Sequence, residues 1–255
     1  MRLASWNVNS IRIREPAVLE WVKRTEPDVL CLQETKVVDD DFPTDELLRL
    51  GYAVAAAGQP TYNGVAIAAR LPLSDVRIGL DDDPPDADRR LISATIGGLS
   101  VVNAYVPNGK SVTSPSFAEK LRWLGRLRRT LDARYAATDP LVVCGDFNVA
   151  REARDVFDPE RYRGRIHFHP DEHRALDGVL DFGLADAFRH FHDGAGAYSW
   201  WDFRTGGFAK NEGLRIDYVF VTRPLLARAT NAFIDTAPRK ADKPSDHAPV
   251  VLELA

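Results

Sequence analysis

Carboxylate, amide and imidazole side chains stand beside short apolar runs at five separate places in this sequence. They are Asn7 and Asn9, Glu34 with Lys36, Asp146 and Asn148, Asp217, and Asp246 with His247. Each taken singly has an ordinary explanation, since Asp and Asn form turns and a lone Glu is usually a surface charge. Repeated polar groups at the ends of buried strands are costly unless they meet a cation or one another. We therefore expect them to converge in one site.

The residue types in this set indicate metal-assisted phosphate chemistry. Oxygen ligands without a plausible cysteine ligand favour a hard cation, Mg²⁺ or alternatively Mn²⁺. Such an ion would neutralise the charge of a phosphodiester, and Asp146 would orient and deprotonate a water molecule. His247 would stabilise charge on the phosphoryl oxygens, and Asp217 would fix the imidazole. Both Asp146 and His247 stay open as the general base.

Other chemistry is disfavoured by the sequence context. Ser245 lies directly beside Asp246 and His247, and no Gly-x-Ser-x-Gly segment occurs, so a serine-hydrolase triad is not expected. Cys31 and Cys144 lie inside apolar runs and are expected to be buried, unreactive thiols. The remaining histidines lack a matching ligand framework and are predicted at the surface; they are His167, His169, His173, His190 and His192.

The composition predicts one well-cored catalytic domain spanning residues 1–255, with 45% hydrophobic and 27% charged residues. No apolar stretch of membrane-spanning length occurs, and the first residues lack a signal-peptide pattern, so we expect a cytoplasmic protein with no membrane partner. We also expect a monomer. The formal net charge of −4 argues against coating nucleic acid through bulk charge. Any DNA contact should therefore use a local basic face.

The elements that must position these groups are mainly short strands. Apolar runs predict strands at 3–8, 29–32, 65–69, 91–96, 101–105, 141–144, 216–221 and 250–254. Apolar spacing and capping residues predict helices at 15–25, 115–135 and about 170–182. Arg122, Arg126 and Arg129 should form a solvated helix face, and the acidic segment 81–86 an exposed loop. This order favours an α/β sandwich, two packed sheets with helices outside.

Nine segments, in this order, resemble the endonuclease/exonuclease/phosphatase superfamily, and within it exodeoxyribonuclease III and related abasic-site endonucleases. They are WNVNSIR (6–12), LQETK (32–36), NGVA (63–66), NAYVPNG (103–109), GDFNVA (145–150), DAFR (186–189), YSWW (198–201), LRIDY (214–218) and SDHAP (245–249). The resemblance implies a four-layer α/β sandwich with mainly antiparallel or mixed sheets. It also implies a DNA-repair phosphodiesterase that cuts 5′ to abasic sites in double-stranded DNA, with 3′→5′ exonuclease and 3′-phosphatase activity.

The same resemblance implies roles for the polar residues. Glu34 would be the main metal ligand, with Asn7 and Asp246 near the metal. Asp146 with Asn148 would position the attacking water.

Further implied roles concern the phosphate and the metal charge. Tyr105 would contact the phosphate, and Asp217 would pair with His247. Some family members carry Asp at the position of Asn9, so this chain has one fewer negative charge near the metal, which disfavours a tightly held second ion.

The resemblance also implies how DNA is held. Trp200, Leu214 and Ile216 would line an apolar slot that accepts an extruded sugar without a base. The residues expected against the DNA backbone are Arg12, Lys36, Lys110 and Arg215. Trp201 is equally open to a role in core packing. The alternatives are a phosphoesterase of the same fold acting on a small phosphate ester or lipid headgroup, and a non-catalytic DNA-binding relative.

Overall fold

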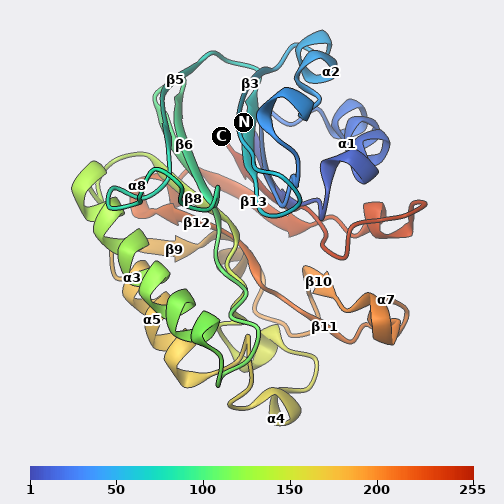
Figure 1. The fold of residues 1–255 in the computed structure, drawn as a ribbon, viewed down its shortest axis with the longest axis vertical. Coiled ribbons are helices and arrows are strands. Elements are labelled where there is room, and N and C mark those ends of the chain that lie inside the picture. Colours follow the sequence, from blue (N-terminus) through green and yellow to red (C-terminus); the bar gives the residue numbers. More distant parts are fainter.

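Two six-stranded sheets face each other, with helices on their outer sides (Figure 1). A computed structural model describes all residues, 1–255. The first sheet has the order β13-β14-β1-β2-β4-β3, the second β5-β6-β7-β8-β12-β9, and β10-β11 form a separate hairpin. Only the β1–β2 and β7–β8 pairs are parallel, so each sheet is mixed. The expected four-layer α/β sandwich is confirmed.

The strands have the following bounds. In the first sheet they are β1 (Arg2–Asn7), β2 (Val29–Gln33), β3 (Ala53–Ala57), β4 (Val65–Ala69), β13 (Ala229–Ile234) and β14 (Val250–Leu254). In the second they are β5 (Leu73–Ile78), β6 (Leu91–Ile96), β7 (Leu99–Tyr105), β8 (Leu141–Asp146), β9 (Leu184–Asp186) and β12 (Asp217–Thr222). The hairpin strands are β10 (Trp200–Trp201) and β11 (Gly213–Leu214).

The helices lie mainly on the two outer faces. They are α1 (Ile11–Thr25), α2 (Thr44–Arg49), α3 (Pro115–Arg134), α4 (Pro159–Tyr162), α5 (Pro170–Leu180), α6 (Ala187–Phe191), α7 (Gly207–Lys210) and α8 (Arg223–Leu226). In Figure 1, α1 and α2 lie beside the first sheet and α3 and α5 beside the second. None of these helices combines the length and the hydropathy that a bilayer crossing needs.

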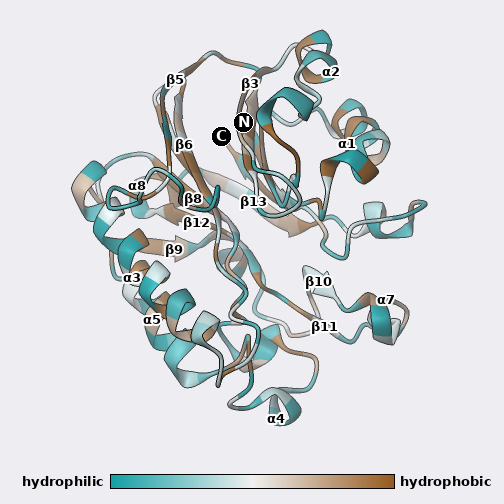
Figure 2. Cartoon of the chain, viewed as in Figure 1, coloured by the Kyte–Doolittle hydropathy of each residue, from teal (hydrophilic) through white to brown (hydrophobic).

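The core has three main parts, as this layering requires. A cluster of 22 buried residues fills the space between the sheets, with Leu3 and Ile67 from one side and Ile92 and Val219 from the other. A cluster of 20 lies between the second sheet and α3 and α5, and one of 16 packs α1 against the first sheet. Apolar colour is concentrated in the strands in Figure 2, while the helices show hydrophilic outer faces.

The predicted strands are present, with shifts of a few residues at their ends, and Cys31 and Cys144 are free and buried as expected. Helix α3 begins as predicted, because the Ser114 side chain accepts a hydrogen bond from the Phe117 N–H. Helix α1 begins four residues earlier than expected, at Ile11, and holds Pro16 inside it. The prediction missed β3, β5, β9 to β11 and β13, which are short, partly exposed or lack a clear apolar run.

The acidic loop at 81–86 is mostly exposed, as predicted, but it does not stand free. Arg126 forms ion pairs with Asp82 and Asp83, and Arg129 also reaches Asp82. The expected solvated arginine face on α3 is confirmed for Arg122 and Arg129, which are exposed, whereas this loop covers part of Arg126.

Candidate active site

Sheet pairing brings the distant polar segments to one edge of the sandwich. Parallel pairing aligns Asn7 with Gln33, which precedes Glu34, so these groups leave the first sheet together. In the second sheet Tyr105 lies beside Asp146, and Asp217 at the start of β12 pairs with Asp146 at the end of β8. Parallel strands share their carboxyl ends, whereas an antiparallel partner begins there.

Tight backbone geometry holds several of these residues in place. Asn9, Glu34, Lys36 and Asn148 all have positive φ, at 45°, 53°, 57° and 55°. Such conformations cost non-glycine residues energy and are concentrated at functional sites. At Gly145 a Cβ atom would lie 1.8 Å from the Ala104 carbonyl oxygen, so only glycine lets β8 approach β7 this closely beside Asp146.

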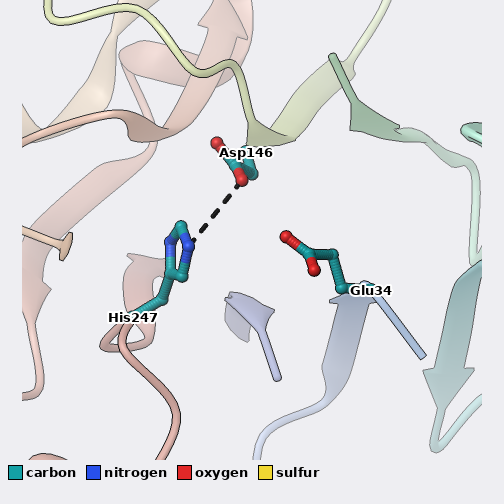
Figure 3. A group of neighbouring side chains, drawn as sticks. All are labelled: Glu34, Asp146 and His247. Atoms are coloured by element: carbon teal, nitrogen blue, oxygen red, sulfur yellow. Dashed lines mark ion pairs between the residues drawn. The ribbon is translucent and has the colours of Figure 1, made fainter. Parts of the chain in front are cut away.

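Five residues form a group that we term the polar cup: Glu34, Asp146, Asp217, Asp246 and His247. Three of them, Glu34, Asp146 and His247, each offer one ligand atom within 4.8 Å of the others. Figure 3 shows the two carboxylates and the imidazole pointing into one space from three separate segments. The Nε2 atom of His247 lies 3.9 Å from Oδ2 of Asp146. The amide nitrogen of Asn7 bridges the acids, donating to Glu34 at 2.8 Å and to Asp146 at 2.9 Å.

A buried chain of hydrogen bonds orients His247. Its Nδ1 lies 2.9 Å from Oδ2 of Asp217. The same oxygen accepts a hydrogen bond from the Ser199 hydroxyl at 2.6 Å. Ser199 in turn accepts the backbone N–H groups of Ile216 and Asp217. Ser199 was not singled out as a site residue from the sequence, although it lies inside the YSWW segment.

The acids of the cup differ in their protonation. Burial, with Asp217 and Glu34 nearby, raises the pKa of Asp146 to about 8, although His247 and Asn7 oppose the change. Burial lowers the pKa of His247, but Asp217 and Asp146 outweigh it and raise the pKa to about 10. Without a metal, Asp146 and His247 therefore hold a proton readily.

Glu34 and Asp246 remain anionic for separate reasons. Burial raises the pKa of Glu34, but Lys36 and the Asn7 hydrogen bond outweigh it, so the net pKa is lowered. Burial likewise raises the pKa of Asp246, but His247 and a hydrogen bond from Trp200 lower it overall. This pattern leaves fixed negative charge on the rim of the cup.

The donor set fits a hard divalent cation. Glu34 and Asp146 supply the oxygen ligands that such an ion prefers, and the His247 ring lies beside them. The Lys36 ammonium lies 2.7 Å from Oε2 of Glu34 and 2.6 Å from Oδ1 of Asn9, so a positive group already occupies one side of the carboxylate.

The two other residues expected near the metal lie less directly in the group. The Asn7 amide oxygen accepts the backbone N–H of Asn9 at 3.0 Å, while its nitrogen faces the acids. Asp246 accepts hydrogen bonds from Asn9 at 2.9 Å and from the Trp200 indole at 2.9 Å. Both carboxylate oxygens of Asp246 are therefore engaged by the chain.

Two amides and a phenol lie beside Asp146. The Asn148 N–H donates to Oδ1 of Asp146 at 2.9 Å, and the Asn108 side chain donates to Oδ1 of Asn148 at 3.0 Å. Burial, together with Glu34 and Asp146, raises the pKa of Tyr105 well above its ordinary value. The Tyr105 hydroxyl therefore stays protonated and serves as a hydrogen-bond donor.

A groove of about 840 Å³ opens beside Glu34 and Tyr105. Lys36 and Lys110, two of the residues expected against DNA, lie along it. Arg12 lies elsewhere on the surface, exposed and paired with Asp41 at 2.7 Å.

Arg215 requires a correction, because it cannot contact the DNA backbone from its position. Its side chain is 1% exposed, and Nε lies 2.8 Å from Oδ1 of Asp155. Nη2 lies 2.8 Å from Asp186, and the guanidinium stacks 4.5 Å from the Tyr218 ring centre. A buried guanidinium committed to two carboxylates is part of the core.

The three residues expected to line the sugar slot do form one apolar cluster with Ala150 and Val156. Leu214 is 0% exposed and Ile216 is 2% exposed, while Trp200 is partly exposed. Trp201 is buried at 2%, as core packing requires.

His167 also requires a correction, since it was predicted at the surface. It is 8% exposed, and its ring centre lies 6.1 Å from that of Trp200. Its Nδ1 lies 2.7 Å from the Asn148 carbonyl oxygen. The remaining four histidines are exposed or partly buried.

Comparisons with known proteins agree with this geometry. The model of the endonuclease/exonuclease/phosphatase family matches residues 4–247. Exodeoxyribonuclease III of Haemophilus influenzae is 34% identical over 266 residues, which span all of both chains. The structure of an AP endonuclease from Archaeoglobus fulgidus matches with a TM-score of 0.96 at 40% identity, covering 100% of this chain and 99% of the other. A Neisseria 3′ phosphatase bound to a product DNA hairpin matches with a TM-score of 0.96 at 38% identity and the same coverage. The resemblance drawn from the sequence motifs is confirmed, and this chain belongs to the endonuclease/exonuclease/phosphatase family.

Proposed function

We propose that this chain is a Mg²⁺-dependent DNA-repair phosphodiesterase, with Mn²⁺ as the alternative ion. It hydrolyses the backbone 5′ to abasic sites and removes nucleotides or phosphate from 3′ ends. The observation that carries the proposal is the convergence of Glu34, Asp146 and His247 within 4.8 Å. The relatives include exodeoxyribonuclease III and an AP endonuclease, and a structural neighbour is bound to DNA.

The metal, held by Glu34 and Asp146, would supply positive charge against the phosphate and the leaving oxygen. Asp217 holds Nδ1 of His247 and thereby fixes Nε2 toward the phosphoryl position. The Tyr105 hydroxyl would donate to a phosphoryl oxygen, and the Asn148 N–H, at 2.9 Å from Oδ1 of Asp146, orients the carboxylate that positions the attacking water. In-line attack then leaves a 3′ hydroxyl and a 5′ sugar phosphate at an abasic site.

The proton of the water passes to Asp146 or to His247. Nε2 of His247 and Oδ2 of Asp146 lie 3.9 Å apart. Asp146→Asn and His247→Asn should each lower kcat by orders of magnitude while the protein stays folded, because both act on the reaction and not on the core. A variant with near-normal turnover would show that the residue has another role.

The apolar cluster at Trp200 bears on the choice of substrate. Leu214 and Ile216 are buried in this cluster and Trp200 is partly exposed, so the cluster offers an apolar face to a sugar that lacks its base. The Neisseria relative is described as a 3′ phosphatase, which supports 3′-end processing as one of the proposed activities.

Three labelled DNA substrates test the proposal in parallel. They are a duplex with a stable abasic analogue, a duplex with a recessed 3′ hydroxyl end and a nicked duplex with a 3′ phosphate. Each is incubated with Mg²⁺ and with Mg²⁺ plus excess chelator. We expect hydrolysis of at least one DNA substrate, and chelator should abolish it.

A soluble inositol phosphate serves as the comparison substrate. Hydrolysis of this ester with none of the DNA substrates cut would favour the small-ester phosphatase. DNA binding without hydrolysis of any substrate would favour the non-catalytic relative. Either result would overturn the proposal.

A further inference from the structure

A fully buried ammonium lies beneath the active site. Lys120 is on the inner face of α3, beside Trp123 and Leu124, and its side chain is 0% exposed. Nζ forms an ion pair with Glu172 of α5, whose side chain is also 0% exposed. A charged residue in such an apolar stripe is uncommon.

The same ammonium holds two loops of the active site. Nζ of Lys120 donates to the carbonyl oxygen of Asn148 at 2.6 Å and to that of Asn108 at 3.2 Å. Asn108 follows β7 and Asn148 follows β8, so one group ties together the ends of two neighbouring strands. Their side chains also join, since Asn108 donates to Asn148, and the Asn148 N–H donates to Asp146.

The loop after β7 passes closely over the Lys120 side chain. Gly109 has a φ of +88°, and a Cβ atom there would lie 3.2 Å from Cδ of Lys120 and 2.9 Å from Cδ1 of Ile166. The loop is therefore packed against the lysine stem as well as bonded to its ammonium. Movement of the stem would displace the loop directly.

Stability alone does not account for this buried charge. Burial lowers the pKa of Lys120, and Glu172 only partly offsets the change. A buried ion pair often contributes less than well-packed apolar residues of the same volume. An apolar residue at 120 would also continue the stripe of α3. The lysine instead contributes through its three N–H donors, which bind Glu172 and the carbonyl oxygens of Asn108 and Asn148.

We infer that Lys120 is a positioning residue for the reaction proposed above. Its ammonium fixes the backbone carbonyls of Asn108 and Asn148 from beneath, and so holds their paired side-chain amides and the Asn148 N–H against Asp146, the carboxylate that positions the attacking water. The inference rests on the proposed function. Loss of the ammonium should misplace these amides without removing them, and a misplacement of about 1 Å can cost about 100-fold in rate.

The test is a double variant, Lys120→Met with Glu172→Gln. It removes both charges together, so no unpaired ion is left buried, and glutamine keeps an acceptor for the His169 N–H. The substrate is whichever DNA the wild type hydrolyses. We expect kcat to fall about 10- to 100-fold while KM stays within about threefold, since the change affects alignment more than binding.

Two further variants separate positioning from stability. Leu131→Ala removes a fully buried side chain from the same helix without touching either loop, and it should lower Tm but leave kcat within about twofold. Glu172→Gln alone leaves the Lys120 ammonium without its counter-ion but bonded to both carbonyls, so it should lower Tm while retaining most of the wild-type kcat.

All rates are measured at a temperature where circular dichroism shows each variant to be folded. A folded double variant with near-wild-type kcat would overturn the inference, and so would an equal kcat loss in Leu131→Ala. Failure of the double variant to fold would assign the pair to stability and would also overturn it. If the wild type itself hydrolyses no DNA, the proposed function fails instead.

Discussion

Replacing Ser199 with alanine should damage catalysis without altering any group that touches the substrate. The Ser199 hydroxyl donates to Asp217 at 2.6 Å, and the same oxygen of Asp217 binds Nδ1 of His247. The other oxygen, Oδ1 of Asp217, is buried with no hydrogen-bond partner. The serine is therefore a main restraint on the carboxylate that orients the imidazole.

The magnitude follows from the bonds that are lost. A hydrogen bond to a charged group contributes about 1.5–3 kcal/mol. If about 2 kcal/mol of this holds His247 in its reactive orientation, kcat falls about 30-fold. In the wild type the backbone N–H groups of Ile216 and Asp217 donate to the Ser199 hydroxyl, and the variant leaves both without an acceptor. A total loss of about 2–3 kcal/mol corresponds to a Tm decrease of about 5–10 °C in a protein of this size.

The assay is steady-state hydrolysis of the preferred DNA substrate, with Tm measured by differential scanning fluorimetry. Ser93→Ala is the matched control, because Ser93 is a buried strand serine whose hydroxyl has no hydrogen-bond partner. It should change neither kcat nor Tm appreciably. Ser199→Thr keeps the hydroxyl and should restore most of the activity. If Ser199→Ala lowers Tm but leaves kcat within about twofold, Ser199 serves only the fold and the reasoning is refuted.

Three further predictions follow from charges in the structure. Arg215→Met leaves the Asp186 carboxylate buried without its ion-pair partner and Asp155 with Arg189 alone, so unfolding in urea should show a loss of about 3–5 kcal/mol; a stable variant with weakened DNA binding would instead favour a surface role. Burial lowers the pKa of His167 to about 3. Below the ordinary pKa of about 6.5 the imidazole takes up a proton in the unfolded chain but stays neutral in the folded protein, so stability present above that pH is lost as pH falls toward 3. Urea unfolding between pH 7.5 and 4.5 should therefore show a steeper acid loss in the wild type than in His167→Gln, and parallel pH curves would contradict this. Mg²⁺ at 100 times its Kd should add about 3 kcal/mol to the free energy of unfolding of the wild type and so raise its Tm. The rise in Tm should be clearly smaller in Glu34→Gln, and an equal rise in both proteins would place the ion elsewhere.

Much of the site could be predicted because its residues follow strands directly. Asp146 and Asn148 come at the end of an apolar run, and Glu34 comes at the end of another. Strand pairing then leaves few places for them, since β1–β2 and β7–β8 are parallel and their ends coincide. The order of the motifs identified the family, and the model of that family matches residues 4–247.

Residues whose roles depend on distant partners could not be placed in this way. Arg215 lies in a motif and reads as a surface cation, but its partner Asp155 is 60 residues away in the chain. Lys120 lies on the buried face of α3 with nothing nearby in the sequence to pair its charge, and its partner Glu172 is 52 residues away. His167 appears in a polar segment with no apolar periodicity, and only the folded loop buries it beside Trp200.

The sequence by itself therefore determined the eight strands with clear apolar runs, the helices α3 and α5, the polar groups at the strand ends and the family. Local patterns decide these features, because the alternation of apolar and polar residues selects an element and its buried face. The tertiary structure alone decided which charges are buried and what each one holds. A charge is stable inside a protein only beside a partner, and the fold, not the neighbouring sequence, supplies that partner.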